Sequence, residues 1–266
     1  MMTEVKLMKA FIGLVKKDLS LMKFWYIVWL VVFIIGMAGV YILSVYLSEP
    51  LIPVPFLMMA AGFHMFLAPI SLLYTLNLEG KTQLWLYNPQ SSLKLLLSKL
   101  SAAAIIQLIA QLIISLYALF IMQVLVKAGK IASFGNFLPI KQGIFMQLGI
   151  FSTAMYISIW FIFLWTVYHS LGKYPAIRHF RWLAVVLVWF AWSLLEGLLL
   201  KTKTLTNEWF SLDLSVRIEP NLKYEDGWNI IYTDVSLPII PILLYAALAI
   251  TFLLLASWLL DRKVEV

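Results

Sequence analysis

NLEGKTQLWLYNPQSSLKLLLSKL, residues 77–100, is a polar stretch between two long apolar segments. Its charged residues are Glu79, Lys81, Lys94 and Lys99. Pro89 cannot continue a helix and disfavours a helical conformation in the residue before it, whereas Ser91-Ser92 can open a new helix. The stretch therefore predicts a short helix, a turn and a second helix that enters an apolar environment. It is either an amphipathic element that receives a soluble partner or an ordinary polar loop.

The composition of the whole chain places it in a membrane. Of its 266 residues, 63% are hydrophobic and only 12% are charged, and the mean hydropathy is +0.93. A water-soluble domain could not bury so much apolar surface, and apolar runs of about 20 residues match a hydrocarbon core of roughly 30 Å. The runs are continuously apolar without period-two alternation, which favours helices over the strands of a barrel. The predicted fold class is an all-α, polytopic membrane protein.

Six apolar segments predict six transmembrane helices within a single transmembrane domain that spans residues 1–266. The second segment contains Pro69, which predicts a kink. A long connection, residues 201–237, precedes the last span and holds most of the acidic residues. The predicted spans are approximately 24–47, 56–76, 100–126, 143–168, 182–200 and 238–260.

Residues 1–23 precede the first span and have a different pattern. Apolar residues recur at alternating steps of three and four, while lysines occupy the opposite face, which predicts a basic amphipathic helix lying in the membrane interface. The alternative is a solvated helix packed on a soluble partner. The apolar positions are Val5, Met8, Ile12, Val15, Leu19 and Met22, and the polar ones are Lys6, Lys9, Gly13, Lys16, Lys17 and Ser20.

The distribution of charge predicts the orientation. Most of the 20 lysine and arginine residues fall in the N-terminal helix, the 77–100 stretch, the loop after the fourth span and the C-terminal tail. The positive-inside rule then places both termini in the cytoplasm of a cell, with the chain a multi-pass protein of the cell membrane. The net charge of +7 fits anionic lipid headgroups, and we expect no nucleic acid partner. The chain has no cysteine, which excludes disulfides and thiolate chemistry.

A few polar residues lie inside the predicted spans. Gln107 and Gln111 are followed by Ser115 at steps of four, so they should face protein or a wet cavity rather than lipid. Glu196 is the acid placed well inside a span, and it either pairs with Lys201 near the outer interface or acts in gating or substrate contact. His64 stands alone on an apolar helix, and we interpret it as structural rather than as a metal ligand.

The sequence contains no pattern of an enzyme active site. No paired carboxylates, serine-histidine-aspartate set or HExxH motif occurs. Gly80-Lys81-Thr82 does not complete a P-loop, because Thr75 occupies the position that requires the first glycine. We therefore expect that the chain is not an enzyme and binds no metal, ATP or other cofactor of its own.

The order of these elements resembles the permease subunits of ATP-binding cassette (ABC) exporters, the type-two ABC membrane family. The residues that carry the resemblance most directly are Glu79-Gly80-Lys81-Thr82-Gln83-Leu84-Trp85-Leu86, Asn88-Pro89, Lys94 and Lys99. Members of that family often have an acidic and a basic residue near Gly-Thr, then a leucine-rich turn that ends in proline. A helix with a lysine then leads into the third span. The likeness covers nearly the whole chain at the level of layout.

The resemblance implies a mechanism. Residues 79–92 would form a cytoplasmic coupling helix docked on a separate P-loop ATPase subunit, which would hold ATP and Mg²⁺. The N-terminal helix would be an elbow helix, and residues 201–237 would cap the exit, partly as re-entrant helices. A second permease chain, the same or related, would complete a path for export of a small molecule, lipid or peptide, with Gln107, Gln111 and Glu196 as candidates for the path or its gate. The candidate ATPase contacts are Glu79, Gly80, Lys81, Thr82, Leu84, Trp85 and Pro89.

Two other function classes remain open from the sequence. A membrane sensor or immunity protein would bind a partner through the same stretch and transport nothing. A proton-coupled secondary carrier would depend on Glu196 and on a proton gradient instead of ATP.

Overall fold

The computed structural model describes residues 2–82, 90–130, 140–174, 178–205, 213–224 and 228–262. In these ranges seven α-helices, two short 3-10 helices and two strands follow one another. They are α1 (Met2–Tyr46), α2 (Pro53–His64), α3 (Leu67–Thr82), α4 (Ser92–Lys127), α5 (Ile140–Ser170), η1 (Leu171–Lys173), η2 (Arg178–Phe180), α6 (Arg181–Leu205), β1 (Asp213–Tyr224), β2 (Trp228–Pro238) and α7 (Ile239–Arg262).

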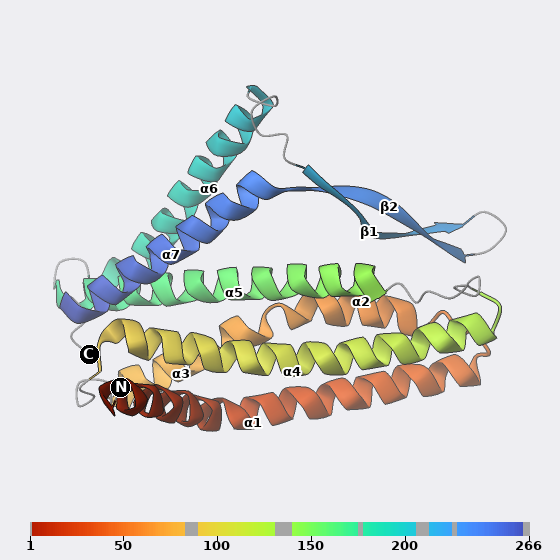
Figure 1. The fold of residues 1–266 in the computed structure, drawn as a ribbon, viewed down its shortest axis with the longest axis horizontal. Helices are drawn as coiled ribbons and strands as arrows, with labels where there is room; N and C mark the ends of the chain where they lie inside the picture. Colours follow the sequence, from red (N-terminus) through yellow and green to blue (C-terminus); the bar gives the residue numbers. More distant parts are fainter. Residues whose placement is uncertain are drawn as a thin grey trace.

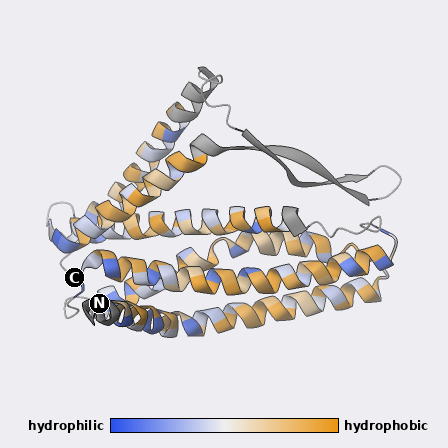
Figure 2. Cartoon of the chain, in the orientation of Figure 1, coloured by the Kyte–Doolittle hydropathy of each residue, from blue (hydrophilic) through white to orange (hydrophobic). Residues whose placement is uncertain are grey.

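Most of the helices run along one another in an elongated bundle (Figure 1). Both ends of the chain lie at one end of this bundle, which we call the terminal end, together with the end of α3 and the beginning of α4 (Figure 1). Helix α6 leans away from the bundle, and the two strands lie beside α5. Hydrophobic residues dominate the lengths of the helices, whereas strongly hydrophilic residues gather near the helix ends (Figure 2).

Six helical segments are long and apolar enough to cross a membrane. Each predicted span overlaps one of them, with ends that differ by a few residues, which confirms the six-span layout of a multi-pass membrane protein. The second segment, Pro53–Thr82, consists of α2 and α3 and is interrupted at residues 65–66. Pro69 lies three residues after this interruption, which agrees with the kink predicted from that proline.

Helix α1 corrects the prediction of a separate interfacial helix. It is one helix of 45 residues without a break between Lys23 and Phe24, roughly 65 Å long at the usual helical rise. No glycine or proline lies between Gly13 and Gly36 to interrupt it. Its N-terminal half packs on the bundle through Leu14, Val15, Leu19 and Met22, so that part of the predicted apolar face is covered by protein.

The connection before the last span differs from the predicted re-entrant helices. Helix α6 continues to Leu205, and β1 then pairs with β2 in a two-stranded antiparallel sheet. The register pairs Asp213 with Pro238 and Tyr224 with Trp228, with one irregularity between Arg217 and Glu219. The described fold is thus helical apart from this hairpin, which the all-α prediction did not include. In the sequence of β1, apolar residues alternate with polar ones at Leu214, Val216 and Ile218, a pattern that predicts a strand.

The main core lies where α1, α3, α4, α5 and α7 meet. Helix α4 occupies its centre and contacts each of the other four. Small residues on the facing surfaces let the helix backbones approach closely, a common device in membrane bundles. Fully buried examples are Ala68, Ala102, Ala103, Ala110 and Ala256.

Candidate functional site

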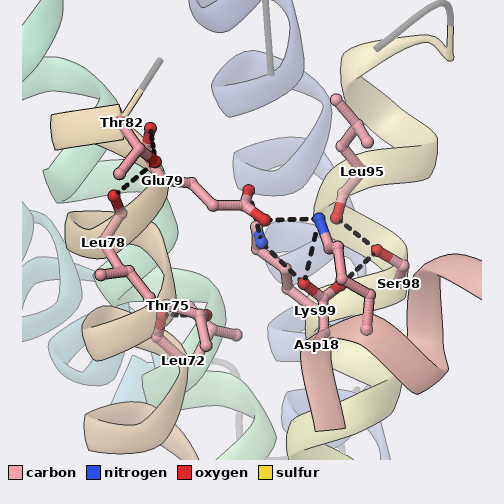
Figure 3. Close-up of polar contacts among 10 residues, drawn as sticks. Asp18, Leu72, Thr75, Leu78, Glu79, Thr82, Leu95, Ser98 and Lys99 are labelled. Carbon is pink, nitrogen blue, oxygen red and sulfur yellow. Dashed lines mark hydrogen bonds and ion pairs between the residues drawn. The ribbon is translucent and has the colours of Figure 1, made fainter. Parts of the chain in front are cut away.

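Four charged side chains from three helices meet at the terminal end of the bundle. Lys99 of α4 bridges Asp18 of α1, at 2.9 Å, and Glu79 of α3, at 2.7 Å (Figure 3). Lys17 of α1 binds the other carboxylate oxygen of Glu79 and lies 3.6 Å from Asp18. Ser98 donates a hydrogen bond of 2.7 Å to the second oxygen of Asp18. We call Lys17, Asp18, Glu79, Ser98 and Lys99 the charge cluster.

The chain brings these residues together through the geometry of its helices. Glu79 lies in the last turn of α3, and Lys99 lies two turns into α4. Both residues flank the connection between two consecutive spans, so they lie at the same end of the bundle. Asp18 reaches them because the N-terminal part of α1 packs on these helices instead of ending before them.

The charge cluster is buried and internally balanced. Asp18, Glu79 and Lys99 are 0%, 1% and 1% exposed, and Lys17 closes the cluster from its partly exposed edge. Two carboxylates face two ammonium groups, and every carboxylate oxygen of Asp18 and Glu79 has a partner. Burial of a charge is costly unless it is paired and hydrogen-bonded. The cluster therefore fixes α1, α3 and α4 relative to one another, because movement of one helix would leave a buried charge unpaired.

The predicted ATPase contacts divide into three groups. Glu79 and Gly80 are buried, whereas Lys81 and Thr82 are exposed. Leu84, Trp85 and Pro89 lie outside the described residues, as does half of the predicted coupling helix. Residues 79–82 continue α3 and do not begin a separate helix. Glu79 is bound by Lys17 and Lys99 of its own chain, which positions the end of α3; its contact with an ATPase subunit stays a prediction.

Sequence reasoning missed the other members of the charge cluster. Asp18 had an available signal, since it is an acid on the same helical face as Val15, Leu19 and Met22 in an otherwise basic helix. Lys99 lies in an apolar part of the stretch, and its position predicts only a place in the ABC permease motif, not an ion pair with Asp18. An acid and a lysine on apolar faces of different helices can be matched only once the helices are packed.

The glutamines of α4 face protein, as their spacing predicted. Gln107 and Gln111 are 0% and 5% exposed. The side-chain nitrogen of Gln111 donates to the backbone oxygen of Gln147 in α5, at 3.0 Å, and Gln147 donates to Ser115, at 2.9 Å. The oxygen of the Gln107 side chain accepts a hydrogen bond from the backbone nitrogen of Ala68, at 3.3 Å. These residues connect helices inside one chain; a role in a path between two chains stays a prediction.

Glu196 has a partner on the last helix. The hydroxyl group of Tyr245 donates a hydrogen bond of 2.6 Å to its carboxylate, and the ring of Tyr156 from α5 packs edge-on against Tyr245. This contact joins the outward-leaning α6 to α7. The gating role predicted for Glu196 remains a prediction.

His64 does not belong to a group of potential metal ligands. Among the described residues, no set of three or more histidine, aspartate or glutamate side chains could hold a metal ion. His64 is 1% exposed, and its ring lies against Trp29, with 5.2 Å between the ring centroids.

The chain is similar to a protein of Bacillus subtilis (strain 168) named Uncharacterized protein YhcE. The two sequences are 33% identical over 270 residues, which cover 97% of this chain and 100% of the relative. No family model matches the chain, and no solved structure matches it. The similarity to YhcE extends over the whole helical layout, from α1 to α7.

Proposed function

This chain belongs to the family of the Bacillus subtilis protein YhcE, and we propose that it is the membrane-spanning subunit of an ABC exporter. With a second permease chain, it forms a path across the cell membrane for a small molecule, lipid or peptide. Separate P-loop ATPase subunits bind the stretch between α3 and α4 and supply ATP hydrolysis with Mg²⁺. The terminal end, with both chain termini, faces the cytoplasm. The chain itself carries out no enzymatic step.

The observation that carries this proposal is the charge cluster. It lies where α3 ends and α4 begins and ties both of these helices to α1. A soluble subunit that moved this stretch would therefore move three spans together. An ordinary polar loop would need no such support, because it has no force to transmit and buried ion pairs stabilise a protein weakly if at all.

The position of the exposed residues supports the same proposal. Lys81 and Thr82 are exposed on the last turn of α3, directly before the stretch. They are available to a partner while Glu79, one turn back, is bound within the chain. The terminal end thus combines an accessible surface with a rigid base, which is the arrangement that a coupling element requires.

The proposal is tested by isolating the chain with its partners. The tagged chain is extracted from its native membrane in a mild detergent, and the proteins that accompany it are identified by mass spectrometry. We expect a P-loop ATPase in near-equal amount, with ATP hydrolysis that depends on this chain. Recovery of a receptor or another enzyme in its place would favour the sensor or immunity class, and cargo movement that persists without ATP but needs a proton gradient would favour a carrier.

Single substitutions then test the contact itself. Trp85→Ala and Lys81→Ala should lower the ATPase recovered with the chain, and Trp85→Ala should uncouple hydrolysis from export while the chain still inserts in the membrane. Lys130→Ala is the matched control, because Lys130 is also an exposed lysine and follows α4 at the opposite end of the bundle. If Trp85→Ala and Lys81→Ala both retain the full amount of bound ATPase and coupled export, this stretch has no part in the mechanism.

A further inference from the structure

The second span is interrupted in the interior of the bundle. Helix α2 ends at His64 and α3 begins at Leu67. Pro69 has no backbone N–H, and its ring clashes with the carbonyl group of a residue four positions earlier, which disfavours a regular helix through Met65. Interrupted backbone at membrane depth is tolerated where protein surrounds it, and Leu67, Ala68 and Pro69 are all buried here.

A side chain from the neighbouring helix occupies the gap. In a continuous helix, the N–H of Ala68 would donate to the carbonyl oxygen of His64. In the structure it donates to the side-chain oxygen of Gln107 instead, at 3.3 Å. Insertion of a side chain into the backbone ladder is one of the recognised causes of a sharp bend. Gln107 therefore holds the interruption by replacing a helical hydrogen bond.

Two residues at the gap also hold buried polar atoms without a partner. Among the described residues, both ring nitrogens of His64 and the side-chain nitrogen of Gln107 have no hydrogen-bond partner. The side chains of His64 and Gln107 are 1% and 0% exposed, and Gln107 reaches the turn after His64 through its bond to Ala68. Unpaired buried polar groups are rare in folded proteins because each costs free energy. These atoms can be explained if they have partners in a second arrangement of the same residues.

We infer that the second span is a hinge with two states and that the Gln107 side chain is its latch. In the structure, Gln107 accepts the hydrogen bond of Ala68 and the span is interrupted. In the second state the Ala68 N–H returns to the His64 carbonyl oxygen, and the released amide of Gln107 pairs with the His64 imidazole. Both states have a partner for the Ala68 N–H, and the second state also pairs the Gln107 side chain with one of the two imidazole nitrogens.

The parts of the span on either side of the hinge are held differently. Helix α3 is fixed at its far end by Glu79, which binds Lys17 and Lys99. Helix α2 packs through a small cluster of Val54 with Ile121 and Leu125 of α4. We therefore expect α2 to change its angle while α3 stays with the charge cluster. This inference concerns the chain alone and holds whether or not the proposed function is correct.

Spin labels can measure the hinge directly. The natural chain has no cysteine, so Met59→Cys on α2 and Leu116→Cys on α4 place two labels at exposed positions. Labelled chain is reconstituted in lipid nanodiscs with an excess of unlabelled chain, so that only distances within one chain contribute. The distance distribution is then recorded by electron paramagnetic resonance in this parent and in variants of the latch.

Substitutions at Gln107 and at His64 should each remove a different one of the two states. Gln107→Leu cannot accept the Ala68 hydrogen bond, so the distribution should lose the population of the interrupted span. Gln107→Asn, whose amide is one methylene shorter, should shift the distribution in the same direction. His64→Phe removes the partner that Gln107 needs in the second state, so it should leave a single narrow population. Gln111→Leu is the matched control, because Gln111 bonds to α5 and not to the gap, and its distribution should equal that of the parent.

The outcomes separate the hinge from a fixed bend. A shift in Gln107→Leu or Gln107→Asn, with none in Gln111→Leu, supports the latch. Distances in both Gln107 variants that match those of the parent would overturn it, since the bend would then be set by Pro69 alone. An equal shift in Gln111→Leu would also overturn it, because the change would then reflect general loosening around α4.

Discussion

The charge cluster and the interruption of the second span lie at opposite ends of the same helix, α3, and treat buried polar groups in opposite ways. At the charge cluster, Asp18, Glu79 and Lys99 are buried and their carboxylate oxygens are all bound. At the interruption, His64 and Gln107 are equally buried, but three of their side-chain nitrogens have no partner within the described part of the chain. Helix α3 therefore begins next to buried polar groups that lack hydrogen-bond partners and ends next to buried charges that are fully paired.

This difference indicates where the molecule can change shape. A paired buried charge resists movement, because separation of the pair leaves an ion in a poorly solvating environment. A buried amide with an unused donor can change partners at little cost, because both arrangements leave few groups unpaired. We therefore expect α3 to remain fixed to α1 and α4 at the charge cluster and the span to bend at its interruption.

The largest effect should come from removing the shared cation of the charge cluster. Lys99→Met leaves Asp18 and Glu79 with Lys17, which is half-exposed, and should lower the free energy of unfolding by about 3–5 kcal/mol. Thermal unfolding of the detergent-purified protein measures the loss. Lys94→Met is the control, because Lys94 lies on the same helix but is exposed, and it should unfold like the parent. Equal stability of Lys99→Met and Lys94→Met would mean that the cluster does not hold the helices together.

A second substitution should restore part of that stability. Lys99→Met with Glu79→Gln removes one charge of each sign and leaves Lys17 beside Asp18, 3.6 Å away. The double variant should be more stable than Lys99→Met by about 1–3 kcal/mol, the usual range of coupling between residues in one network. The same unfolding assay checks this. If the loss of stability in the double variant equals the sum of the losses in Lys99→Met and Glu79→Gln, then Glu79 and Lys99 act independently.

The smallest effect should come from the interruption. His64→Phe replaces a buried ring that has no hydrogen-bond partner in the described residues by an apolar ring that can pack on Trp29. Since no hydrogen bond is lost, the free energy of unfolding should change by less than about 1 kcal/mol in either direction. A loss as large as that of Lys99→Met would contradict the contrast between the two sites and would indicate that His64 has a strong partner.

Much of the layout could be predicted from the sequence, because span length and apolar content depend on local composition. The six spans, the kink near Pro69, the start of a helix after Ser91 and the inward face of Gln107 and Gln111 all follow from spacing along one segment. The continuity of α1 and the hairpin at 213–238 were missed, although neither region lacked a signal. The alternation of apolar and basic residues in 1–23 led to the prediction of a separate helix, although no helix breaker precedes the first span. The many acidic residues of the connection drew attention away from its alternating strand pattern.

The sequence by itself determined that this chain is a multi-pass helical membrane protein with a polar stretch between its second and third spans. Hydrophobic length, proline and helical periodicity are properties of contiguous residues, so they can be evaluated without knowing the fold. Only the tertiary structure decided that Glu79 is buried against Lys17 and Lys99, and that Gln107 enters the backbone of another helix. Those contacts join residues far apart in the sequence, and their energies depend on distance and burial, which exist only after the helices have packed.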